Sequence, residues 1–252
     1  MGPLGFAAIT FACTFGCAWA GMVVRSWLPQ AHLSKESQDV VRLGMGLVAT
    51  MTALLLGLVT ASAKGSFDSN DLAIRNGASG ILTLDRLMAR YGPEMKPTRE
   101  LLRQVVADRI EQTFAPEAGP PVVPAGETAI PAEQIENQIL ALAPATETQR
   151  WLKTESLKLC EEVLRTRWRV LSSASGSVPR TFLVVVIFWL AMTFASFGLA
   201  APRNATVIAA LGISAFSVAA AVFLILELDG PYTGLIRVSS EPLRHALANL
   251  GR

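Results

Sequence analysis

Hydrophobic positions in this 252-residue chain are concentrated in four windows that contain no Asp, Glu, Lys or Arg. The windows are residues 1–24, 43–63, 181–202 and 204–226. A helix rises about 1.5 Å per residue, so about 20 apolar residues cross a hydrocarbon layer about 30 Å thick. Backbone amides in hydrocarbon must be hydrogen-bonded within their own segment, which favours helices over strands. The pattern therefore predicts an all-α membrane protein with four transmembrane helices.

A second pattern, with apolar residues at helical spacing among polar ones, lies between the second and third windows. Ile81, Leu84 and Met88 follow this spacing, and Gly92-Pro93 then forms a helix stop. A last long helix is expected over about Glu147 to Ser172. Closely spaced prolines mark an extended loop at 115–131. These features predict a helical soluble domain between the second and third transmembrane helices.

The two patterns together divide the chain into four parts. Residues 1–63 carry transmembrane helices at about 4–24 and 43–63, residues 64–180 form the helical soluble domain, residues 181–226 form a transmembrane hairpin, and residues 227–252 form a C-terminal tail. An even number of crossings places both termini and the soluble domain on one side of the membrane. Basic residues flank the crossings on both sides, so charge does not choose that side.

Composition and charge narrow the function classes. Half of the chain is hydrophobic (51%) and only 17% is charged, which is typical of a membrane protein. Residues 64–180 contain 15 basic and 15 acidic residues, so there is no basic face for nucleic acid. His32 and His245 are the only histidines, and motifs for phosphate, zinc or paired-cysteine chemistry are lacking. We therefore expect no catalytic residues, no metal and no cofactor.

Small residues form a stripe on the second transmembrane helix. Gly46, Thr50, Ala53, Gly57 and Ala61 follow one another at steps of four, three, four and four, which places them on one helical face. Small residues let helices pack closely in lipid, and a smooth face with a hydroxyl also suits the wall of a pore. The sequence leaves packing and pore lining as open alternatives.

Two polar clusters lie outside the crossings. Glu227, Asp229 and Pro231 follow the fourth crossing, where the carboxylates could coordinate a cation or form the rim of a pore. The alternative is a solvated helix end with a turn at Gly230-Pro231. Asp85 and Arg86 could form an intrahelical or interhelical ion pair or lie on a solvated helix face. Both alternatives stay open in the sequence.

Three motifs in order resemble the bestrophin-like family of bacterial membrane proteins, a domain of unknown function. They are S-Q-D-V-V-R-L-G-M-G-L-V-A-T at 37–50, L-D-R-L with Y-G-P-E at 84–94, and E-L-D-G-P-Y with S-S-E-P-L-R at 227–244. The resemblance covers nearly the whole chain. It implies a structural or gating role for motif residues Asp85, Arg86, Tyr91, Glu227, Asp229, Pro231 and Arg244.

Bestrophins proper are pentameric anion channels with four membrane helices and a cytosolic helical block, and their second helix lines the pore. The resemblance thus implies a homo-oligomeric channel for small ions, anions in particular, in the bacterial inner membrane. The lipid bilayer, further copies of the chain and small ions are then its partners, and the soluble domain and both termini are cytoplasmic.

The chain departs from bestrophins proper at two places. Its second crossing has no Phe and many small residues, and its tail has only Glu227 and Asp229 where animal bestrophins carry a longer acidic run for calcium. Calcium gating is therefore not expected. The alternative function is a membrane-anchored scaffold or sensor whose soluble domain binds a partner. An intramembrane enzyme is disfavoured because Cys13 and Cys17 have no base nearby.

Overall fold

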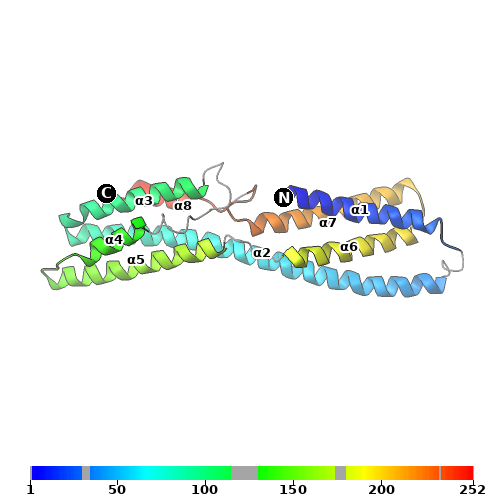
Figure 1. Cartoon of the computed structure of the whole chain (residues 1–252), viewed down its shortest axis with the longest axis horizontal. Helices are drawn as coiled ribbons and strands as arrows, with labels where there is room; N and C mark the ends of the chain where they lie inside the picture. The colour runs from blue at the N-terminus through cyan, green and yellow to red at the C-terminus, as the bar shows by residue number, and fades with distance from the viewer. Residues whose placement is uncertain (1, 30–34, 115–129, 174–179, 233, 252) are drawn as a thin grey trace. The chain divides into compact units, whose positions relative to one another are not determined.

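A computed structural model describes residues 2–29, 35–114, 130–173, 180–232 and 234–251. Regular structure in these ranges is helical throughout (Figure 1). The helices are α1 (Pro3–Arg25), α2 (Lys35–Tyr91), the 3₁₀ helix η2 (Pro93–Met95), α3 (Lys96–Phe114), α4 (Ile130–Leu140), α5 (Glu147–Ser173), α6 (Arg180–Ala200), α7 (Ala205–Asp229) and α8 (Glu241–Asn249). The predicted Pro-rich loop lies outside the described residues, except for its last two positions, which begin α4.

Four helices are long and apolar enough to cross a membrane. They are α1, the Asp39–Tyr91 part of α2, the Thr181–Ala200 part of α6, and α7. Each follows from one uncharged window of the sequence, because a segment of that length must satisfy its own backbone hydrogen bonds in lipid. The predicted all-α membrane fold with four transmembrane helices is confirmed.

The second transmembrane helix does not end where the polar sequence begins. It continues as the single 57-residue helix α2, which also supplies the first helix of the polar segment. No proline interrupts it, and one glycine such as Gly65 costs about 1 kcal/mol, too little to end a long helix. The helix ends at Tyr91 because Gly92 has a φ of 148° and Pro93 begins η2. The predicted stop at Gly92-Pro93 is confirmed.

The chain forms two compact units. The first, called here the membrane unit, comprises Met1–Ser66 and Gly176–Asp229, and the second, the helical unit, comprises Phe67–Ser175 and Gly230–Arg252. In the membrane unit α1 packs against α6 and α7 (Figure 1). In the helical unit α3 contacts α4 and α8, and α4 contacts α5.

The contact between α1 and α6 is close enough to require glycine. A methyl group added at Gly21 would collide with the carbonyl oxygen of Ala195, and one added at Gly198 would collide with that of Ala18. Ala18 is fully buried in this contact. Such approach of two backbones gains dispersion energy along the whole crossing, which is how small residues stabilise helix pairs in lipid.

The core of the helical unit comes from the helically spaced apolar residues. Leu84 and Met88 of α2, Met95, and Ile139 of α4 are all less than 2% exposed. Cys160 of α5 packs on the same cluster, and desolvation of its thiolate, with a smaller effect of Glu136, raises its pKa to about 11. Burying such side chains stabilises the helical unit by about 1.5–3 kcal/mol per large apolar residue.

Candidate functional site

The predicted small-residue stripe of α2 is open in the single chain. Gly46, Thr50, Ala53, Gly57 and Ala61 are all exposed. A methyl group added at Gly46 or Gly57 would meet no atom within 4 Å. The stripe is therefore not a packing seam within the described chain. Its two remaining roles, contact with another copy or the lining of a pore, both require a surface outside the chain.

The whole apolar part of α2 is poorly covered. Only 6% of its most apolar window is buried, against 28% for α1, 33% for α6 and 22% for α7. Beside the small residues lies a row of exposed large ones, with Leu47 63%, Leu54 75% and Leu58 62% exposed. The helix thus presents a smooth strip and a bulky strip side by side, both apolar and both uncovered, whereas Thr52, Val59 and Ala63 are buried on another side of it.

Thr50 supplies the polar group of the stripe. Its Oγ1 donates to the carbonyl of Gly46 at 2.7 Å and lies 3.0 Å from the carbonyl of Leu47. The hydroxyl proton is therefore committed to the helix backbone, and the oxygen lone pairs are left to face the exposed side. An anion can take the Thr50 proton only if the hydroxyl rotates away from Gly46.

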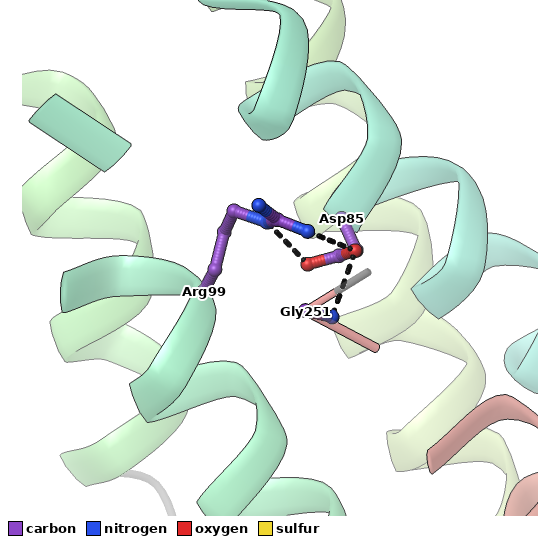
Figure 2. Close-up of polar contacts among 3 residues, drawn as sticks. All are labelled: Asp85, Arg99 and Gly251. Carbon is purple, nitrogen blue, oxygen red and sulfur yellow. Dashed lines mark hydrogen bonds and ion pairs between the residues drawn. The ribbon is translucent and has the colours of Figure 1, made fainter. Parts of the chain in front are cut away.

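Asp85 forms a buried ion pair in the helical unit. Its two carboxylate oxygens accept from Arg99 of α3, with Nε at 2.7 Å and Nη2 at 2.9 Å, and the backbone N–H of Gly251 donates at 3.3 Å (Figure 2). Gly251 has a φ of 83°, a conformation that other residues rarely adopt. The pair raises the pKa of Arg99, chiefly through the hydrogen bonds to Asp85. This cluster joins α2, α3 and the C-terminal turn.

The interpretation of Asp85 and Arg86 as one solvated face is wrong for Asp85. Asp85 is 2% exposed and its partner is Arg99, whereas Arg86 is exposed. Neighbouring residues on a helix point about 100° apart, so one can reach the core while the next remains in water. The alternative of an interhelical ion pair is correct, with a partner that the sequence did not indicate.

The cluster after the fourth crossing is also less solvated than the turn interpretation requires. Glu227 is 3% exposed and Asp229 is half-buried at the end of α7. The solvated helix end is therefore wrong for Glu227, because α7 remains covered in its last turn. Pro231 is buried as well, and its carbonyl accepts the N–H of Val238 at 2.9 Å.

Two further polar contacts fix the tail and the end of α2. The hydroxyl of Tyr232 donates to Oδ1 of Asn70 at 3.1 Å, and both residues are buried. Burial raises the pKa of Tyr232 to about 12, an effect that Arg109 opposes. Tyr91 is buried and its carbonyl accepts from Gln149 at 3.3 Å. Sequence reasoning missed Asn70 and Gln149, since neither belongs to a recognisable pattern.

Arg244 lies apart from these contacts. It is exposed on α8, where its Nε donates to Oγ of Ser240 at 3.2 Å. Within the described ranges, no group of three or more His, Cys, Asp or Glu residues is close enough to hold a metal ion.

Comparison with known proteins identifies the family to which this chain belongs. Residues 11–243 match the Bestrophin-like domain. The chain belongs to the bestrophin-like family. No curated protein matches the chain in sequence.

Solved bestrophin homologues have the same fold. The crystal structure of a bacterial bestrophin homologue from Klebsiella pneumoniae is 13% identical, covers 96% of each chain and has a TM-score of 0.68. A structure of a homologue from the same species with one mutation is 14% identical, covers 98% of this chain and 96% of its own, and has a TM-score of 0.63. At these identities the likeness is one of fold, and the bestrophin fold is therefore shared over nearly the full length.

Proposed function

We propose that this bestrophin-like protein is a homo-oligomeric membrane channel that passes small ions, with the exposed face of α2 along the channel axis. The observation that carries the proposal is the uncovered apolar length of α2, whose stripe from Gly46 to Ala61 is exposed in the described part of the chain. A helix with two uncovered strips can contact neighbouring copies with one and surround an axis with the other. Membership of the bestrophin-like family supports the same function.

The finer assignments rest on the family likeness. We propose anions as the favoured ions and a pentamer as the assembly. We also place the protein in the bacterial inner membrane with the helical unit and both termini in the cytoplasm. The proposal includes no enzymatic activity and no cofactor. Asp85, Tyr91, Glu227, Asp229, Pro231 and Arg244 take structural or gating roles in it, and Arg86 is available at the surface.

The test is ion flux through purified full-length protein in liposomes. We expect chloride-dependent flux above that of empty vesicles and a reversal potential that follows the chloride gradient. Flux equal to that of empty vesicles in several salts would overturn the channel. Flux that follows the cation gradient would overturn only the choice of anions.

A matched pair of variants tests the role of α2. Gly57→Leu places a large side chain on the stripe, and Gly16→Leu places the same side chain on α1, where the added atoms also meet open space. We expect Gly57→Leu to reduce flux to the level of empty vesicles and Gly16→Leu to leave it unchanged. Equal effects of the two variants would contradict an axis lined by α2.

Particle images of the same samples separate the channel from the scaffold alternative. A symmetric ring with an axial opening is expected for the wild type. If Gly57→Leu breaks the ring while the wild type conducts no ions, the stripe serves assembly of a membrane-anchored scaffold instead.

A further inference from the structure

Two arginines meet where α1 and α6 end in the membrane unit. Nη1 of Arg25 donates to the carbonyl of Ala200 at 2.8 Å, and Nη2 of Arg203 donates to the carbonyl of Met22 at 2.8 Å. The last carbonyls of a helix lack partners and carry the negative end of its dipole, so each guanidinium stabilises the end of the other segment. Arg203 also lies 3.3 Å from Oγ of Ser26. The Arg25 guanidinium is therefore held at the end of α6, and the Arg203 guanidinium at the end of α1.

Capping leaves most of the hydrogen-bonding capacity of this pair unused. A guanidinium has five N–H donors, and these contacts occupy one on Arg25 and two on Arg203. In the described part of the chain neither arginine contacts a carboxylate. The sequence has no Asp or Glu in residues 1–35 or 163–226. The two helix ends offset about half a charge each, so the pair keeps a net positive charge.

The position of the pair is that of a membrane surface. Arg25 ends one apolar helix that is long enough to span a bilayer, and Arg203 lies just after another. Trp27, in the turn after α1, is 81% exposed, and tryptophan prefers the headgroup level of a bilayer. Arg25 is half-buried and Arg203 exposed, so both side chains remain accessible from outside the described chain.

We propose that Arg25 and Arg203 form a binding site for the phosphodiester headgroup of an anionic phospholipid. The planar guanidinium fork matches two phosphate oxygens, and a basic residue at an anionic surface contributes attraction that a zwitterionic headgroup does not. Free phosphate offers the same oxygens but lacks the acyl chains that hold a lipid at this depth. The site does not depend on ion conduction.

Lipid retention by the purified full chain tests this site. Native mass spectrometry in mild detergent is carried out after titration with phosphatidylglycerol or with phosphatidylcholine of identical acyl chains. We expect retained phosphatidylglycerol in preference to phosphatidylcholine, and a decrease of this preference with added salt. The variant Arg25→Gln/Arg203→Gln should lower phosphatidylglycerol affinity by about 30-fold, at about tenfold or less per arginine.

Two controls separate the site from general effects of charge and folding. Arg103→Gln removes one exposed arginine from α3 and should leave retention unchanged. Arg25→Lys/Arg203→Lys keeps the charge without the fork, so its affinity should lie between those of the wild type and the glutamine variant. Elution volume and circular dichroism report whether each variant is folded.

Three results would overturn the proposal. They are equal retention of the two lipids by the wild type, unchanged retention by a folded glutamine variant, and a loss of the same size in Arg103→Gln. Inorganic phosphate is titrated against bound phosphatidylglycerol as a further arm. If inorganic phosphate displaces phosphatidylglycerol at a concentration equal to that of the lipid, the site belongs to a free phosphate anion rather than to a lipid.

Discussion

Two helices of the membrane unit carry the same pattern of small residues in opposite surroundings. On α1 the stripe is Thr10, Thr14, Ala18 and Gly21, and on α2 it is Gly46, Thr50, Ala53, Gly57 and Ala61. The α1 stripe is buried, and a methyl group at Gly21 would collide with the α6 backbone. The α2 stripe is exposed, and a methyl group at Gly57 would meet nothing. Small residues thus permit close approach without determining the partner.

Two adjacent charged residues of α2 show the same contrast between a buried and an exposed position. Asp85 is buried in an ion pair with Arg99, while its neighbour Arg86 is exposed. Both belong to one of the motifs by which the chain resembles the bestrophin-like family. Membership of a motif therefore does not reveal whether a charge stabilises the core or faces the solvent.

The largest expected effect is at the buried charge. Asp85→Asn leaves the guanidinium of Arg99 without its counter-charge in a site where the side chain of Arg99 is 15% exposed. We expect a loss of about 3 kcal/mol in the free energy of unfolding, measured by denaturant titration in mixed micelles. Arg86→Gln is the matched control and should change it by less than about 0.5 kcal/mol. Equal losses would remove the contrast between the two positions.

The two glycine stripes provide the next test. Gly21→Ala forces α1 and α6 apart, so we expect a loss of about 2 kcal/mol in the free energy of unfolding, measured in the same way. In Gly57→Ala the added methyl group meets open space, and alanine favours the helix more than glycine does. The free energy of unfolding of the single chain should therefore rise by about 0.5 kcal/mol. A comparable loss in Gly57→Ala would mean that another chain already fills the α2 stripe under the conditions of measurement.

A smaller effect is expected from the hydroxyl groups. Tyr232→Phe leaves buried Oδ1 of Asn70 without this donor and should lower the free energy of unfolding by about 1 kcal/mol. Thr50→Ala removes a hydroxyl that bonds only its own helix at an exposed position and should change it by less than about 0.5 kcal/mol. Thermal unfolding of both variants beside the wild type measures the difference.

The smallest effect at neutral pH concerns Cys160. Its thiol keeps its proton up to about pH 11 in the fold, whereas the ordinary pKa is 9.0. Its contribution to stability is therefore fully present below pH 9.0 and lost as the pH rises toward 11. Cys160→Ala should remove this part of the pH dependence. Maleimide labelling at pH 8 should be slow for Cys160 until the chain is unfolded, and rapid labelling of the folded chain would contradict its burial.

The sequence was sufficient for the helices but not for their contacts. Window length and the absence of charge predicted the four crossings, and Gly92-Pro93 predicted the end of α2. The partners of Asp85 lie 14 and 166 residues away, and no local period marks Arg99 or Gly251. The continuity of α2 was also missed, because a change from apolar to polar residues alters the surroundings of a helix without ending it.

Hydrophobicity and helical period are properties of a local segment, so the sequence by itself determined an all-helical membrane protein and the position of the small-residue stripe on α2. Burial is a property of two segments in contact, so only the tertiary structure decided that the α1 stripe is closed by α6 and the α2 stripe is open. The same reason explains Asp85 and Glu227, whose burial depends on helices packed against them and not on the residues beside them in the chain.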